Sequence, residues 1–131
     1  MKLEIIEEVR DHLTDGFVPY TIISIIVNNE EVGRMVLREG NDKDVYLEGH
    51  ISYHIDEEYR GHHFAYKACL LLKEYIDKEH VLITCSPDNI ASKKTIERLN
   101  AEYIETIQIP KNQRKYYPNE THKCIYRWKV K

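Results

Sequence analysis

The sequence predicts a mixed α/β domain rather than a regular alternation of strands and helices. Strand-like stretches occupy both ends of the chain, and two stretches with helical spacing lie between them, separated by one short apolar strand. The length of 131 residues suits a single domain, residues 1–131, with one core. Hydrophobic residues make up 42% of the chain and charged residues 31%, which is typical of a folded, soluble protein.

The N-terminal part is predicted to form strands. Alternation over residues 1–5 favours a first strand, although the apolar spacing over residues 3–13 would also suit a helix. Residues 21–27 are β-branched and nearly all apolar, as in a strand covered on both faces. An Asn-Asn-Glu turn connects them to an alternating stretch, residues 32–38, so these two strands should form a hairpin.

A two-faced strand is predicted over residues 45–55, because apolar and polar side chains alternate there. One face would carry Val45, Leu47, Gly49, Ile51, Tyr53 and Ile55. The opposite face would carry Tyr46, Glu48, His50, Ser52 and His54. This polar face gathers several acid–base side chains in one place.

The next elements are a helix and three strands. Residues 64–76 place apolar side chains at helical spacing, and His80 should end that helix. Residues 81–85 then form a short buried strand. Residues 103–109 and 124–130 are the last two strands, joined by a polar loop.

A second helix is predicted after the short buried strand. Asp88 or Asn89 can cap it by accepting a first-turn N–H. Ile96 and Leu99 should face inward, with Ser92 on the same stripe.

The turn between the two-faced strand and the first helix is the most informative segment. Its sequence is Tyr59-Arg60-Gly61-His62-His63-Phe64-Ala65. A turn that passes directly from a strand into a helix directs several free backbone N–H groups at one point, and the helix dipole adds to their attraction for an anion. This local chemistry suits a phosphate, so a phosphate-bearing cofactor is expected here.

Two stretches together resemble the GCN5-related N-acetyltransferase (GNAT) family. The first, residues 55–65, resembles that family's acetyl-CoA motif, Arg or Gln followed by two residues, Gly, one residue, and Gly or Ala. The second, Asn89-Ile90-Ala91-Ser92 followed by Ile96-Glu97-Arg98-Leu99, is similar to the family's Asn-containing helix. The resemblance implies a mostly antiparallel twisted sheet flanked by two main helices, the acyl-CoA N-acyltransferase fold.

The resemblance also implies acetyl-CoA (coenzyme A) as the cofactor and a set of residues that would bind it. Backbone groups along the strand would bond the pantetheine, amides after the turn would bond the diphosphate, and the second helix would contribute from the other side. A backbone N–H near Ile55 would polarise the thioester carbonyl. The residues concerned are Tyr53, His54, Ile55, Arg60, Gly61, His62, His63, Phe64, Ala65, Asn89 and Ser92.

The chain departs from the family pattern at several places. His63 stands where the motif has its central glycine; because only N–H groups are required there, a helical φ is tolerated, with the side chain directed away from the phosphates. Ile96 occupies the position that often bears a thiolate-protonating tyrosine, and Asn100 replaces the usual glycine after that helix. Residues 10–19 are too few for the two helices that the family places there. The acceptor side should therefore be more open, or be completed by a second copy in a homodimer.

Glu48 is the leading candidate for the general base, followed by His50 and His54. An alkylammonium, with a pKa of about 10.4, needs to lose a proton before it can attack a thioester. The alternative for each residue is an ordinary solvated position on a strand. His50 and His54 would lie roughly 13 Å apart on a strand, so no metal site is expected. Cys85 could be an acyl-carrying nucleophile, although a buried free cysteine is the commoner situation.

Composition restricts the function classes. Formal charge is −3 and both signs are mixed along the chain, so no nucleic-acid partner is expected. No apolar run is long enough for a membrane span. Three widely spaced cysteines indicate reduced thiols in the cytoplasm. The predicted function is an acetyl-CoA-dependent N-acetyltransferase acting on an amine of a small molecule, peptide or protein. The alternative is an inactive acyl-CoA-binding sensor or assembly module.

Overall fold

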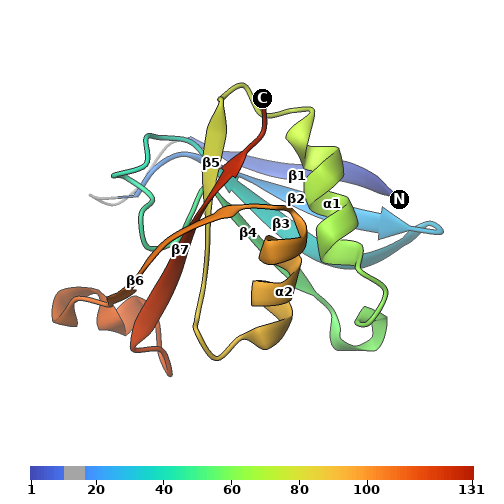
Figure 1. Ribbon diagram of the computed structural model, residues 1–131. Helices are drawn as coiled ribbons and strands as arrows, with labels where there is room; N and C mark the ends of the chain where they lie inside the picture. The colour runs from blue at the N-terminus through green and yellow to red at the C-terminus, as the bar shows by residue number, and fades with distance from the viewer. Residues whose placement is uncertain (11–16) are drawn as a thin grey trace.

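The computed structural model describes residues 1–10 and 17–131. The described residues form a seven-stranded sheet in the order β1-β2-β3-β4-β5-β7-β6 (Figure 1). Neighbouring strands pair antiparallel except β4 and β5, which are parallel, so the predicted mixed and mostly antiparallel sheet is confirmed. The strands are β1 Lys2–Val9, β2 Tyr20–Val27, β3 Glu30–Arg38, β4 Ile51–Ile55, β5 His80–Cys85, β6 Glu102–Gln108 and β7 His122–Lys129. The prediction about residues 10–19 largely concerns positions outside the described part of the chain.

The predicted pair of helices is present. They are α1 Phe64–Lys73 and α2 Ile90–Arg98, with short 3-10 turns at Glu57–Tyr59 and Lys111–Tyr116. Helix α1 is shorter than the predicted 64–76, because Tyr75 and Ile76 donate to carbonyls only three residues back, which tightens and ends the helix. Tyr75 is 76% exposed and does not belong to the apolar stripe, whereas Ile76 is buried. His80 begins β5 instead of ending the helix.

The prediction of one continuous strand over residues 45–55 is wrong, because only Ile51–Ile55 is a strand. Residues 42–48 form turns instead. The Asn41 amide donates to Asp44 Oδ2 at 3.0 Å, and the Asp44 amide donates to Asn41 Oδ1 at 3.1 Å. Such side-chain bonds compete with a strand ladder, so the alternation of the sequence here does not produce two faces.

Gly49 allows the turn segment, residues 42–48, to lie close to β5. Its φ is +77°, and a Cβ on it would lie 2.9 Å from the Leu82 carbonyl oxygen. Replacing Gly49 with alanine is therefore expected to lower the free energy of unfolding by about 2 kcal/mol or more. Gly61→Ala is the matched control, since it also has a positive φ but its Cβ would meet nothing within 4 Å. Equal losses in the two variants, measured by denaturant unfolding, would show that the contact with Leu82 has no effect.

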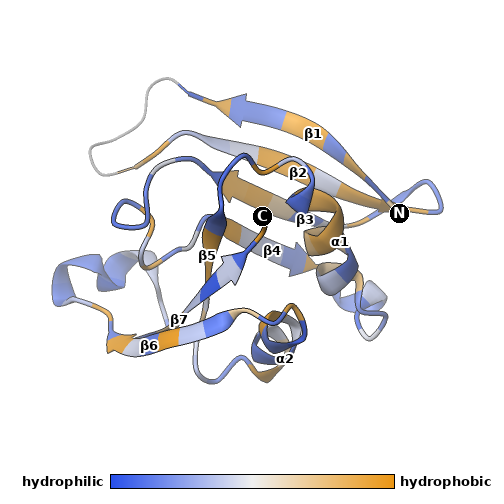
Figure 2. Cartoon of the chain, turned by 45° about the horizontal axis from the view of Figure 1, so that its top comes forward, coloured by the Kyte–Doolittle hydropathy of each residue, from blue (hydrophilic) through white to orange (hydrophobic). Residues whose placement is uncertain are grey.

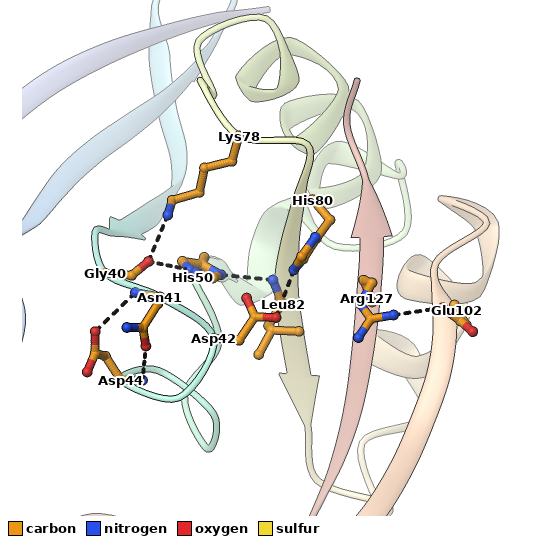
Figure 3. A network of polar contacts seen from close by, with 10 residues as sticks. All are labelled: Gly40, Asn41, Asp42, Asp44, His50, Lys78, His80, Leu82, Glu102 and Arg127. Carbon is orange, nitrogen blue, oxygen red and sulfur yellow. Dashed lines mark hydrogen bonds and ion pairs between the residues drawn. The ribbon is translucent and has the colours of Figure 1, made fainter.

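His50 joins the turn segment to β5 from inside the molecule (Figure 3). It is fully buried, with an exposed fraction of 0%. Its Nδ1 accepts from the Leu82 amide at 2.9 Å, and its Nε2 lies 2.9 Å from the Gly40 carbonyl oxygen, to which it donates. Lys78 Nζ donates to the same carbonyl at 2.8 Å. The expected place of His50 on a solvated polar face is thus wrong, because both ring nitrogens are bonded in the interior.

One core connects the sheet to both helices. Met35, Ile51 and Leu72 are among its fully buried members, and Ile96 brings α2 into the same cluster. Hydrophobic residues lie mainly in the strands of the sheet, above all in β2 and β5, while the connecting loops are mostly hydrophilic (Figure 2). None of the described helices is long and apolar enough to cross a membrane.

Candidate functional site

Strands β4 and β5 diverge almost as soon as they meet. Their parallel pairing consists of Ile51 opposite Ile83, after which β4 turns away from β5 and α2 lies beside the opening (Figure 1). On its other edge β4 is paired with β3 from Ile51 to Ile55. The sheet therefore has a wedge-shaped gap in its middle.

The backbone of β4 presents unused groups to this gap. Bonds from the Arg38 amide to the His50 carbonyl, 2.7 Å, and from the Asp56 amide to the Val32 carbonyl, 2.9 Å, fix which residues face β3. Because hydrogen-bonded and non-hydrogen-bonded pairs alternate in an antiparallel ladder, the N–H and C=O groups of Tyr53 and Ile55 face away from β3. These groups point toward β5, where the described strands provide no ladder partner for them. Of the four, the Ile55 carbonyl is occupied, because it accepts from Arg60 Nε at 3.0 Å.

The segment after β4 presents a run of free amides. Gly61 has a φ of +90°, and His63, the residue that caps α1, has a φ of +61°. The first amide of this region with a backbone acceptor is that of Lys67, which donates to the His63 carbonyl at 3.0 Å. Within the described part of the chain, the amides of residues 61–66 have no acceptor. Such successive N–H groups at a helix start form a concave anion site.

His63 has a left-handed conformation rather than the helical one that the motif tolerates. The chain reverses here between the 3-10 turn and α1. A histidine in that region carries a strain that a glycine would not have. Gly61, His62 and His63 are exposed residues, whereas Phe64 and Ala65 are half-buried. Arg60 does not point into the turn, since its Nε donates to the Ile55 carbonyl at 3.0 Å.

Helix α2 begins as predicted. Asn89 is its N-cap, and its Oδ1 accepts from the Ser92 amide at 3.1 Å. The hydroxyl groups of Ser92 and Tyr53 lie 2.9 Å apart, so they tie α2 to β4. Burial raises the pKa of Tyr53, which keeps its hydroxyl protonated. No local pattern signals this contact, because the two residues are 39 positions apart.

Glu48 belongs to a polar cluster near the start of β4. Its Oε2 lies 2.9 Å from Arg38 Nε, and Arg38 Nη1 donates to Ser52 Oγ at 2.7 Å. Burial, followed by the charge of Glu48, raises the pKa of Tyr117. Sequence reasoning placed Ser52 on the same polar face as Glu48, but it found neither Arg38 nor Tyr117, which come from distant segments.

The other two base candidates lie elsewhere. His54 is on the outer surface, where its side chain is 68% exposed and 3.9 Å from Asp56 Oδ1. His50 has both nitrogens bonded in the interior, as described above. Of the three, Glu48 alone borders a cavity of about 720 Å³, which is lined by β2, β3, the 43–48 turn and residues 110–117.

Cys85 has the properties of a packed thiol. It is 4% exposed, and burial raises its pKa to about 11, so the reactive thiolate is scarce at neutral pH. Cys69 and Cys124 are also free and buried. Ile96 is fully buried in the core and offers no acidic group to the gap.

A parallel strand pair that splays apart beside a free-amide turn is the arrangement of acyl-CoA-dependent N-acyltransferases. The model of the Acetyltransferase (GNAT) domain matches residues 4–102, so the chain belongs to this family. The resemblance of the two motifs is thereby confirmed at the level of the family. Comparison with curated proteins gives no match.

Solved structures show the same fold. The microcin C7 self immunity acetyltransferase MccE, in complex with acetyl-CoA and AMP, aligns with a TM-score of 0.67 and 19% identity over 84% of this chain and 61% of that chain. RimL, a ribosomal L7/L12 alpha-N-protein acetyltransferase in complex with coenzyme A, aligns with a TM-score of 0.66 and 17% identity over 84% and 62%. An acetyltransferase from Salmonella typhimurium that modifies the N-terminal serine of protein L7/L12 gives 0.67 and 19% over 86% and 64%. The chain thus spans less than two thirds of the length of these proteins.

Proposed function

We propose that the protein is an acetyl-CoA-dependent N-acetyltransferase, which transfers an acetyl group to an amine of a small molecule, peptide or protein. The observation that carries this proposal is the run of free amides over residues 61–66, placed next to the open edge of β4. The amine nitrogen would attack the thioester carbonyl directly. An N–C bond forms, the C–S bond breaks, the amine loses one proton, and coenzyme A leaves as its thiol.

The residues present fit acetyl-CoA. Amides of residues 61–66, at the positive end of α1, suit a diphosphate without any cationic side chain. The free backbone groups of Tyr53 and the free amide of Ile55 would bond the pantetheine amides as a neighbouring strand does, with Asn89 and Ser92 on the opposite side. Bound acetyl-CoA would supply an acetyl group activated as a thioester. The further members of this proposed site are Arg60, Gly61, His62, His63, Phe64 and Ala65. His54 is left out, because its backbone groups face β3 and its side chain lies on the outer surface.

Glu48 would receive the proton of the attacking amine. Its carboxylate borders the 720 Å³ cavity, which we propose as the acceptor site. Arg38 stabilises the negative charge of the Glu48 carboxylate. Because Arg38 also donates to Ser52 Oγ, the carboxylate is held near the start of β4. The cavity lies on the face of the sheet opposite α1, because Val36 and Arg38 line it while Met35 packs into the helix-covered core.

Replacing Glu48 with glutamine is expected to lower kcat by about 100-fold at pH 7, since a positioned base commonly contributes that much. The deficit should shrink toward pH 10, where the amine is already deprotonated in solution. Rates across this pH range, with the thermal shift caused by coenzyme A as a check on folding, measure the effect. Glu74→Gln, a change on the C-terminal cap of α1, is the control. A pH profile identical to that of the unmodified protein would exclude Glu48 as the base.

A second candidate function is an acyl-CoA-binding module without turnover. It is favoured by Ile96, which leaves α2 without a tyrosine at the position where the family often has one. Release of free thiol from acetyl-CoA with a panel of amines, measured beside thermal shift with coenzyme A, separates the two functions. A thermal shift without thiol release for any amine would favour the module, and absence of both would exclude the proposed site.

We also propose a cytoplasmic location and a homodimer that completes the acceptor side. The location is supported by Cys69, Cys85 and Cys124, which are all free and buried, as is usual in reducing compartments. The dimer is tested by the molecular mass in solution at micromolar concentration.

A further inference from the structure

We infer that the acceptor is a primary amine carried on an aromatic ring system, and that the cavity beside Glu48 selects for that ring. The inference rests on the proposed function, because it names the acceptor of the same reaction. It starts from what the cavity is made of. Five aromatic side chains line it, from three separate parts of the chain: Phe17, Tyr20, Tyr46, Tyr116 and Tyr117.

The aromatic walls are held in place by contacts of their own. The rings of Phe17 and Tyr116 meet edge to face, with centroids 5.6 Å apart. The Tyr46 hydroxyl donates to Glu105 Oε2 on β6. Tyr117 lies below Lys123, whose Nζ is 4.7 Å from the ring centroid. Rings fixed in this way offer ready-made faces and edges to a flat guest, which prefers offset or edge-to-face packing.

The charges around the cavity exclude strongly charged acceptors. Among the lining residues that the structure describes, the formal charges cancel: Arg38 and Lys43 are cationic, Asp44 and Glu48 are anionic, and Glu48 is already paired with Arg38. A polyamine would therefore find no surplus of negative charge there to compensate its second and third charges. Burying such a charge without a partner is costly. A single amine on an apolar body meets no such penalty.

The size and position of the cavity suit such a molecule. About 720 Å³ lies within the range of small-molecule sites, which are mostly apolar and aromatic with a few polar groups. Val36 and Leu47 add apolar wall, while Glu48 marks the polar end nearest the start of β4. If the aromatic ring of the acceptor packs among the tyrosines, its alkylamine chain extends toward this polar end. There Glu48, the proposed base, would accept the proton of the amine.

The test uses the full chain with acetyl-CoA and four matched amines. These are 2-phenylethylamine, 2-cyclohexylethylamine (similar in shape but without a π system), spermidine, and a short peptide with an N-terminal serine. We expect kcat/KM for phenylethylamine to exceed that of the cyclohexyl compound by about fivefold, the value of one aromatic contact. Spermidine and the peptide should be poorer by about 100-fold, because their polar groups would lose hydration without gaining partners.

Tyr116→Leu supplies the variant. Tyr116 is 46% exposed, so its loss should not affect folding. The substitution is expected to raise KM for phenylethylamine about fivefold, to leave kcat unchanged, and to remove the preference over the cyclohexyl compound. Tyr116→Phe keeps the aromatic ring, so its KM for phenylethylamine should equal that of the unmodified protein. Tyr75→Leu, which replaces a 76% exposed tyrosine at the end of α1, is the matched control.

Binding of the amines to the protein with coenzyme A, followed by ligand-observed NMR, separates this inference from the proposed function. If phenylethylamine binds, and binds more weakly to Tyr116→Leu, but no amine is acetylated, the cavity inference stands and the proposed reaction falls. If spermidine or the peptide is the best substrate and Tyr116→Leu changes nothing, the reaction stands and the inference is overturned. Neither binding nor acetylation of any amine would overturn both.

Discussion

Replacing Gly61 with valine is expected to abolish binding of coenzyme A, raising its Kd by about 100-fold or more. Gly61 has a φ of +90°, a conformation that a β-branched residue resists. Valine would relax the backbone toward negative φ and turn the amides of residues 61–66 away from one another. Each hydrogen bond to a charged group contributes about 1.5–3 kcal/mol, so losing two of them is enough for this effect. Isothermal titration with coenzyme A measures it.

The control for this variant is another residue with positive φ. Asn29, in the turn between β2 and β3, has a φ of +65°, so Asn29→Val imposes a comparable strain at a distance from α1. We expect it to lower the melting temperature while leaving the Kd for coenzyme A unchanged. A Cβ at position 61 would meet no protein atom within 4 Å, so a clash of that atom inside the folded chain does not explain the Gly61 result. Unchanged affinity in Gly61→Val would place the diphosphate elsewhere on the molecule.

Replacing His50 with leucine is expected to lower the free energy of unfolding by about 3 kcal/mol at pH 7. The leucine would leave the buried Leu82 amide without its acceptor, which carries the full desolvation penalty of that group. Gly40 would still have Lys78 as a donor. His50→Asn is the conservative comparison, since its side-chain oxygen can still accept a hydrogen bond, and it should retain more stability. Urea unfolding at fixed pH measures both variants.

The same histidine is expected to make stability depend on pH. Burial holds the pKa of His50 below its usual value of 6.5, and the charge of Lys78 acts in the same direction, while the hydrogen bond to the Gly40 carbonyl and the charge of Asp42 oppose them. The unfolded chain therefore binds a proton more readily than the folded one. Stability from this group is fully present above pH 6.5 and is lost as the pH falls below it, by at most about 2 kcal/mol between pH 7 and pH 5.

The His50→Asn variant isolates this contribution. The pair of His80 and Asp42, 2.8 Å apart, lies close by and remains in the variant. We therefore expect the stability difference between the unmodified protein and His50→Asn to shrink as the pH is lowered from 7 to 5. A difference that stays constant over this range would mean that His50 takes up its proton equally in the folded and unfolded states.

The predictable parts of this fold are those that local patterns determine. The hairpin of β2 and β3 follows from an Asn-containing turn between two strand-like stretches, and Asn28 and Asn29 indeed have positive φ. The cap at Asn89 follows from an amide side chain that needs only a neighbour three residues away. The free amides after β4 follow in the same way from an Arg-Gly turn that leads into a helix.

The parts that failed depend on contacts between distant segments. Residues 45–50 alternate like a strand, but their position is set by β5, where Leu82 meets both Gly49 and His50. The cluster around Glu48 draws Arg38 from β3 and Tyr117 from the segment after β6. Periodicity describes one segment at a time, so it cannot report which distant side chain will meet a carboxylate.

The single residue pair between β4 and β5 divides the sheet into two mechanical units. One unit consists of β1 to β4, and the other of β5, β7 and β6. Near Ile51 and Ile83 the backbone pairing and the His50 bonds connect the two units, and farther along the described residues Tyr53 and Ser92 connect β4 with α2. A small rotation of one unit about this point would change the separation of β4 and β5 far more at the open end of the wedge than at the paired end. A ligand that binds both strands would therefore restrict the relative rotation of the two units. Its affinity would depend on how much rotational freedom the units lose on binding.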